Sequence, residues 1–266
     1  FTLWQRLPGC SMCIIFAAVQ QHPDYPLIIA ANRDEFYARP TAPSSFWHTH
    51  PDMLAGKDLS GGGTRMGVTR NGHIAALTNI RNPGAHSDSK KTRGELVVDY
   101  LTDQPLTGRH LETLKTNADQ YNGFNFLFGH YRHLAVFNSE TGQHAFLGPG
   151  VHGLSNASLN TPWPKALRGT EALQQYIQDT RILDVDRLFT LLRDPTQAQD
   201  NQLPDTSVSF EWEKALSSIF IRTPEYGTRS STVLLVDKAQ NVNWYECHYS
   251  AEGIPGQMQH FSWKSA

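Results

Sequence analysis

The chain has 266 residues, of which 39% are hydrophobic and 18% are charged, and its formal net charge is −2. Acidic and basic residues are interspersed without a basic stripe, so nucleic acid is not an expected partner. No apolar run approaches the ~20 residues of a membrane span, and three cysteines form no disulfide framework, so we expect a cytoplasmic protein without a membrane span.

The N-terminal part of the chain predicts two buried strands followed by a long loop. Residues 1–11 contain one basic residue and no apolar core, so we expect a leader or vector-derived residues there, followed by a single domain over 12–266. Apolar runs with many β-branched residues predict strands at 12–20 and 26–31. Residues 38–63 are rich in Pro, Gly, Ser and His and predict a long loop.

The rest of the chain predicts paired strands, then helices, then more strands. The strands at 64–69 and 73–79 are joined by Asn71-Gly72, a strong hairpin signal. Further along, the pattern predicts helices at 94–102 and 109–118, strands at 124–130, 133–138 and 143–147, helices at 161–177 and 183–193, and strands at 217–222, 230–236, 241–248 and 258–263. This order lacks the strand–helix alternation of a parallel sheet and predicts an α+β fold, an αββα sandwich of two antiparallel sheets flanked by helices.

Cys13 is the first candidate functional residue, because it opens the first predicted strand. If translation begins at Met12, removal of that residue leaves Cys13 with a free α-amine. A thiol has an ordinary pKa of ~8.5 and an α-amine one of ~8, so the amine can accept the thiol proton near neutral pH. The alternative is a buried structural cysteine, which is common.

Four polar residues, Asn32, Arg33, Asp34 and Glu35, continue directly from the second apolar run. Strand side chains alternate, so Asn32 and Asp34 are expected on one face and Arg33 and Glu35 on the other. A solvated strand end with local charge pairing would explain these residues. Charges this close to a buried strand need partners, however, and this favours a functional site.

Three further polar residues, Asn79, Asn156 and Arg229, follow or lie near predicted strand ends. Amide groups at such positions can donate hydrogen bonds to a developing oxyanion, although Asn is also an ordinary strand-ending residue.

Metal and nucleotide sites are not expected. His48 and His50 alternate on the predicted loop without a third ligand at suitable spacing. Lys57 precedes Gly61–Gly63 and a strand follows, whereas the lysine of a phosphate-binding loop follows its glycines and opens a helix. We therefore predict no metal and no cofactor.

Taken together, these segments resemble the NRDE family, also called the transport and Golgi organisation family. The matching segments are Met12-Cys13-Ile14, Asn32–Glu35 with Arg39-Pro40-Thr41, Gly56–Gly67, Ala76–Asn79, Arg93–Leu96, Tyr121–Asn125, Gly153–Asn156, Pro162–Lys165 and Tyr226–Val233. This family is more distantly similar to cysteine N-terminal-nucleophile hydrolases such as penicillin V and bile-salt amidases. The resemblance implies an N-terminal-nucleophile-hydrolase-like αββα sandwich.

The resemblance also implies residue roles. The predicted catalytic residues are Cys13, Asp34, Asn79, Asn156 and Arg229, and the predicted substrate-binding residues are Asn32, Arg33 and Glu35. One departure is that Arg33 and Asp34 are adjacent, whereas two residues separate the corresponding pair in the hydrolases. The sequence therefore favours an amide or ester hydrolase acting on a small-molecule acyl substrate. The alternative is a non-catalytic protein on the same fold that binds or carries haem or an acyl lipid.

Overall fold

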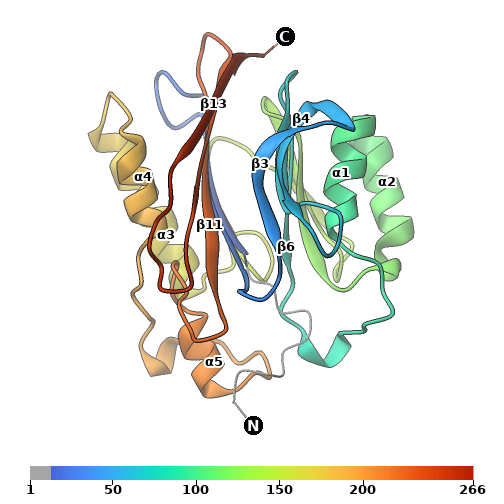
Figure 1. Cartoon of the computed structure of the whole chain (residues 1–266), viewed down its shortest axis with the longest axis vertical. Helices are drawn as coiled ribbons and strands as arrows, with labels where there is room; N and C mark the ends of the chain where they lie inside the picture. Colours follow the sequence, from blue (N-terminus) through green and yellow to red (C-terminus); the bar gives the residue numbers. More distant parts are fainter. Residues whose placement is uncertain (1–12, 266) are drawn as a thin grey trace.

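The structure is a computed structural model that describes residues 13–265. Met12 and the predicted leader at 1–11 lie outside the described residues. Two antiparallel sheets pack face to face, and helices cover the outer face of each (Figure 1). The predicted αββα sandwich is confirmed.

The first sheet contains six strands in the order β10-β1-β2-β11-β12-β13. Their bounds are β1 (Cys13–Val19), β2 (Leu27–Phe36), β10 (Gly150–Leu154), β11 (Tyr226–Val236), β12 (Asn241–His248) and β13 (Gln259–Lys264). The strands β1 and β2 are buried on both faces, which explains why their sequences read as continuous apolar runs.

The second sheet contains seven strands in chain order. Their bounds are β3 (Thr41–Trp47), β4 (His50–Asp58), β5 (Met66–Thr69), β6 (His73–Asn79), β7 (Phe124–His130), β8 (His133–Asn138) and β9 (His144–Phe146). The loop predicted at 38–63 is therefore wrong, because β3 and β4 occupy most of it. Strand β3 is an edge strand with two register shifts, and such positions tolerate the Pro and polar residues that hid it.

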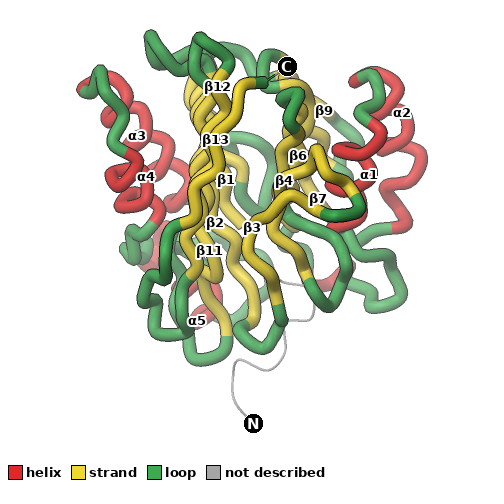
Figure 2. Tube along the Cα trace, turned by 45° about the horizontal axis from the view of Figure 1, so that its top comes forward, coloured by secondary structure: helices red, strands yellow, loops and turns green. Residues whose placement is uncertain are grey.

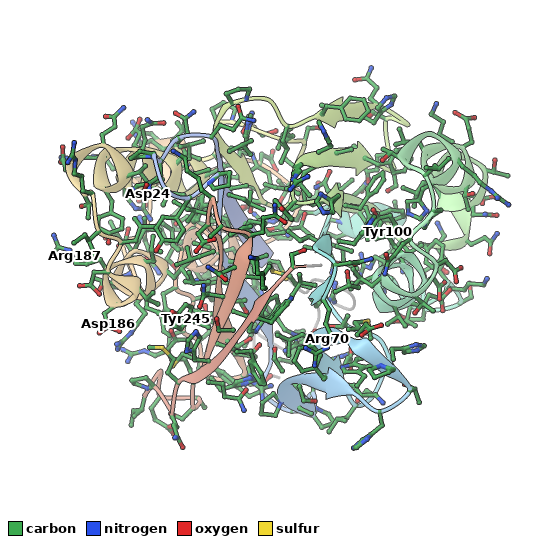
Figure 3. The ribbon with its side chains drawn as sticks, turned by 90° about the horizontal axis from the view of Figure 1, so that it is seen from above. Asp24, Arg70, Tyr100, Asp186, Arg187 and Tyr245 are labelled. Carbon is green, nitrogen blue, oxygen red and sulfur yellow. The ribbon has the colours of Figure 1, made fainter. Side chains whose placement is uncertain are left out.

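Two pairs of helices form the outer layers, which Figure 2 shows on opposite sides of the strands. The helices are α1 (Gly94–Asp103), α2 (Thr107–Asn117), α3 (Pro164–Asp179), α4 (Val185–Leu192) and α5 (Phe210–Ala215), with short 3-10 turns at Pro83–Ala85, Ala118–Gln120 and Asp200–Gln202. Helices α1 and α2 cover the second sheet, and α3 and α4 cover the first. Seen from above in Figure 3, Tyr100 lies on the α1 side and Asp186 and Arg187 lie on the α4 side.

A strand predicted at 217–222 is also wrong. Turns follow α5 there, and only Arg222 makes an isolated bridge, to Gly227. The buried side chains of Leu216 and Ile221 pack with Trp212 and Tyr226 instead of joining a sheet. A short apolar run does not by itself distinguish these two outcomes.

Strand alternation assigns each residue of β1 to one of two cores. Ile15 and Ala17 face the second sheet, whereas Ile14 and Phe16 face α3 and α4. By the same alternation, Cys13 points into the space between the sheets. Within the described residues, no helix is both long enough and apolar enough to cross a bilayer.

Candidate active site

Cys13 begins β1 and lies directly opposite Arg33 of β2. Both residues are on the face that looks toward the second sheet, and Cβ atoms of such a cross-strand pair are about 5 Å apart. On the other side of β1, Ser155 follows β10 and its Oγ is 3.5 Å from the Cys13 carbonyl oxygen, to which it donates. Cys13 is only 3% exposed. Two neighbouring strands thus fix Cys13 at the end of the inter-sheet core.

Asp34 lies on the opposite face of β2 and is completely buried. The Thr228 hydroxyl donates to Asp34 Oδ1 at 2.6 Å. Burial raises the pKa of Asp34 to about 6, although the charge of Lys165 and the Thr228 hydrogen bond both lower it. Asn32 and Asp34 share this face and Arg33 and Glu35 share the other, as the strand alternation predicts.

The groups around the Cys13 thiol have opposing effects on its pKa. Burial raises the pKa of the thiol most strongly, and the Asp34 charge raises it further. The charges of Arg65 and Arg33 and a hydrogen bond from the Asp34 backbone lower it. Because the net effect is a raised pKa, the thiol is protonated at neutral pH, and its use as a nucleophile requires a base.

Asn79 and Asn156 come together beside Cys13. Asn156 Nδ2 donates to the Asn79 carbonyl oxygen at 2.8 Å. Arg65 Nη1 donates to Asn79 Oδ1 at 2.7 Å, and Ser155 Oγ donates to Asn156 Oδ1 at 3.1 Å. The side-chain oxygen of Asn79 accepts from Arg65, and that of Asn156 accepts from Ser155. The amide nitrogen of each residue therefore points away from the donor that its oxygen contacts. The orientation of both amides is therefore fixed by neighbouring side chains.

A buried amide network supports the turn that carries Asn156. Asn125 is fully buried on β7, and its Nδ2 donates to the Ala157 carbonyl at 2.7 Å. Asn138 of β8 donates to Asn125 Oδ1 at 2.9 Å. Thr78 donates to the Ser155 carbonyl at 2.5 Å. Hydrogen bonds from the second sheet thus fix the turn that follows β10 of the first sheet and carries Asn156.

The other predicted site residues have different surroundings. Asn32 donates both amide protons, to the carbonyls of Leu192 and Ile219, and accepts from Ser231, so its polar groups tie β2 to the α4 layer. Arg229 lies at a bulge of β11.

The Arg229 guanidinium donates to the carbonyls of Phe36, Tyr37 and Arg39 at 3.0 to 3.1 Å. It therefore stabilises the loop after β2. Its expected action on the thiol stays a prediction, and the positive charges that do act on the thiol come from Arg65 and Arg33.

Two residues at the site, Arg65 and Lys165, were not predicted from the sequence. Lys165 is the second residue of α3 and only 2% exposed, and among residues 13–265 its Nζ has no hydrogen-bond partner. Burial, followed by the Arg81 charge, lowers the pKa of Lys165 to about 8, although Asp34 and Cys13 act in the opposite direction. Arg81 itself pairs with buried Glu213 at 2.5 Å. A lysine in the first turn of an amphipathic helix gives no sequence signal of burial.

Metal ligands do not gather in the part of the chain that the structure describes. No three His, Cys, Asp or Glu side chains between residues 13 and 265 are grouped as a metal site requires. Cys13 and Cys247 are both buried free cysteines.

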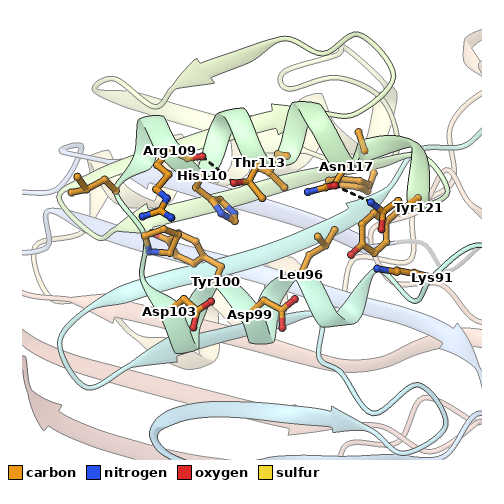
Figure 4. A pocket seen from close by; sticks show the side chains of 16 residues that line it. Lys91, Leu96, Asp99, Tyr100, Asp103, Arg109, His110, Thr113, Asn117 and Tyr121 are labelled. Atoms are coloured by element: carbon orange, nitrogen blue, oxygen red, sulfur yellow. Dashed lines mark hydrogen bonds between the residues drawn. The ribbon is translucent and has the colours of Figure 1, made fainter.

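A separate cavity of about 720 Å³ lies between α1 and α2 (Figure 4). Buried apolar side chains line it, with exposed charged residues around them: Leu96, Tyr100, Leu114 and Phe124, with Lys91, Asp99, Asp103 and Arg109. His110 also lines the cavity, and within the described residues its Nε2 has no hydrogen-bond partner. Burial lowers the pKa of His110 to about 4, so the imidazole is neutral.

The chain belongs to the Transport and Golgi organisation 2 family, whose sequence profile matches residues 12–251. It is 34% identical over 255 residues to the Mus musculus Transport and Golgi organization 2 homolog, covering 88% of this chain and 92% of that protein. The Drosophila melanogaster Transport and Golgi organization protein 2 is 26% identical over 279 residues, covering 95% of each chain.

Solved structures similar to this chain include two hydrolases. The Caenorhabditis elegans N-acylethanolamine-hydrolyzing acid amidase ortholog has a TM-score of 0.48 at 11% identity, covering 84% of this chain and 92% of that chain. A mutant of the conjugated bile acid hydrolase from Clostridium perfringens has a TM-score of 0.39 at 10% identity, covering 97% of this chain and 90% of that chain.

Proposed function

We propose that the protein is a cysteine N-terminal-nucleophile hydrolase that cleaves an amide or ester bond of a small-molecule acyl substrate. The observation that supports the proposal is the buried thiol of Cys13 at the start of β1, on which the charge of Asp34 acts, together with the oriented amides of Asn79 and Asn156. The proposal requires that the residues before Cys13 are removed. A reducing, cytoplasmic setting fits the free thiols of Cys13 and Cys247.

The first half of the reaction is acyl transfer to sulfur. The raised thiol pKa means that a base must remove the proton, and the free α-amine of Cys13 is the base that the same residue supplies. The sulfur attacks the acyl carbonyl, and Asn79 and Asn156 donate to the resulting oxyanion, each donor contributing about 3 kcal/mol. The protonated amine then gives its proton to the leaving nitrogen or oxygen, and the C–N or C–O bond breaks.

The second half of the reaction is hydrolysis of the thioester. Water attacks the acyl carbon and the amine accepts a proton from that water; the carbon–sulfur bond then breaks to release the carboxylic acid, and the ammonium returns its proton to the departing sulfur to restore the thiol and the free amine. Asp34 is the carboxylate whose charge acts on the thiol, and it stabilises the ammonium form of the amine between the two proton transfers.

The experiment compares three proteins: the full chain, a chain that begins at Cys13, and the same shorter chain with Cys13→Ser. A panel of acyl amides, lactones and thioesters is the substrate set. We expect turnover only from the chain that begins at Cys13, and Asn79→Ala should lower its turnover about 10²-fold or more while retaining the fold. Equal turnover by all three proteins would contradict the proposal, and so would no turnover by any of them.

A second candidate function, binding or trafficking of haem or an acyl lipid, is favoured by the cavity between α1 and α2. An apolar interior with charged surroundings suits an amphipathic ligand, and the neutral imidazole of His110 would be the axial ligand for haem. Titration with haemin should then shift the Soret band in wild type and in His144→Phe, an exposed control, but not in His110→Phe. Binding of a fluorescent fatty acid should be retained in wild type, in His144→Phe and in His110→Phe. Absence of saturable binding of both ligands would refute this function.

A further inference from the structure

The guanidinium of Arg33 is buried without hydrogen-bond acceptors. Among the described residues, neither Nη1 nor Nη2 has a hydrogen-bond partner, and both atoms are inaccessible to water. The nearest carboxylate oxygen, Glu35 Oε2, is 3.9 Å from Nη2, which is beyond hydrogen-bonding distance. A buried cation with unused donors is costly unless an acceptor arrives.

Glu35 does not neutralise the charges around it. Its Oε2 is 3.8 Å from Arg39 Nε and 3.8 Å from Arg65 Nη2, so three guanidinium groups surround one carboxylate. No described residue donates a hydrogen bond to Oε2. Arg39 also pairs with Asp58, but among residues 13–265 Arg33 and Arg65 have only Glu35 between them, so the cluster holds more positive charge than its carboxylates balance.

A small cavity of about 50 Å³ adjoins Arg33. Its lining includes Arg33, Lys57, Thr64, Arg65, Ser230 and His248. The acidic residues at its wall already have partners: Asp58 accepts from Arg39 at 2.7 and 2.9 Å, and Glu246 accepts from Ser44 and His248 at 2.7 Å. The volume suffices for a few waters or for one small anionic group.

We propose that this cavity is a subsite for a carboxylate of the substrate, which Arg33 attracts by charge and binds through its two unused nitrogens once its side chain rotates toward the cavity, and which Arg65 assists by charge. Arg33 is the strand partner of Cys13 and lies on the same face, so an anion there is within a few bonds of the reacting carbonyl. Resting on the hydrolase function proposed above, this assigns the substrate class: acyl compounds with a carboxylate close to the scissile bond.

The test uses two alkylating reagents of the same shape, iodoacetate and iodoacetamide, on the full chain with Cys10→Ser. Each reagent forms a carbon–sulfur bond, releases iodide and leaves the thiol proton to solvent, and only iodoacetate carries a carboxylate. The ratio of the two rates at Cys13 cancels any effect of Arg33 on the thiol itself. Cys247, resolved by peptide mass analysis, is the internal reference.

We expect the iodoacetate-to-iodoacetamide ratio at Cys13 to exceed the ratio at Cys247 by about tenfold. Arg33→Met should reduce this preference to near unity, Arg65→Met should reduce it partly, and Arg70→Met, a surface control, should leave it unchanged. A ratio at Cys13 equal to that at Cys247, or one that Arg33→Met does not alter, would overturn the subsite.

Thermal unfolding decides the question if neither reagent reaches Cys13. At equal ionic strength, about 0.1 M acetate should raise the midpoint by about 2 °C or more relative to chloride in wild type, by less in Arg65→Met, and not at all in Arg33→Met. No acetate-specific rise would overturn the subsite. Because neither readout requires turnover, failure of the hydrolase function and failure of the subsite give different results.

Discussion

Replacing Lys165 by Met removes a buried ammonium group whose Nζ has no hydrogen-bond partner among residues 13–265. Met has a similar length and suits an apolar environment, so the change removes charge with little change in packing. The structure therefore predicts that Lys165→Met increases the free energy of unfolding. This outcome is unusual for a core substitution, and it follows from the cost of burying a cation without an acceptor.

The magnitude follows from the pKa of Lys165, which burial lowers from 10.5 to about 8. Each tenfold change in proton affinity corresponds to about 1.4 kcal/mol, so the charged form costs the folded state about 3 kcal/mol at pH 7. This figure already includes the attraction between Lys165 and Asp34, because the charge of Asp34 raises the pKa of Lys165. We expect an increase of about 3 kcal/mol at neutral pH.

The pH dependence distinguishes this cause from better packing. The folded state releases the Lys165 proton near pH 8 and the unfolded state near pH 10.5, so the unfolded state holds more protons in that window. Wild-type stability therefore rises with pH through the window, and the advantage of Lys165→Met shrinks to about 1 kcal/mol by pH 10.

Urea unfolding at a series of pH values measures this difference, with Lys238→Met as an exposed control that should show no such trend. A Lys165→Met variant that is less stable than wild type at pH 7 would refute the reasoning. A stability difference that does not change between pH 7 and 10 would refute it as well.

Three other substitutions have defined outcomes. Gly169→Ala should lower the free energy of unfolding by about 2 kcal/mol or more in urea, because its Cβ would lie 2.0 Å from Phe16 Cζ in the α3 contact with β1; an unchanged midpoint would contradict that packing. Asn125→Ala should cost about 2 to 4 kcal/mol, since it leaves the Ala157 carbonyl and other buried groups unpaired, and Asn125→Asp should not restore the loss. The folded state keeps the Asp34 proton up to about pH 6, so the free energy of unfolding of wild type should fall by about 3 kcal/mol as pH rises from 4 to 6. Asp34→Asn should abolish this decrease. An unaltered pH profile in the variant would contradict the burial of this carboxyl.

Much of the fold could be predicted where one physical signal dominated. The strands β6, β7, β8 and β12 have the predicted bounds, because apolar alternation and clear turns mark their ends. Strands β3 and β4 were missed because their Pro, Gly and His content is typical of loops. Bulges at a sheet edge make such residues acceptable in strands, and that is a property of the sheet rather than of the local sequence.

The candidate site was predictable only in part, for a similar reason. Cys13 begins the first predicted strand and Asp34 follows the second apolar run, and the hydrolase-like order of the site residues suggested that they meet. Arg65 and Lys165 contribute through burial and charge that arise when two sheets and a helix come together. A single sequence contains no local pattern that reports such a contact.

The central claim is that Cys13 accepts an acyl group when it is the first residue of the chain. The most direct measurement is the mass of the Cys13 peptide after brief exposure of that shorter chain to p-nitrophenyl acetate. We expect one acetyl group on Cys13, removed by neutral hydroxylamine as a thioester requires, and much slower acetylation of Cys13 in the full chain. Acetylation confined to lysines or to Cys247, or an equal rate at Cys13 in both proteins, would contradict it.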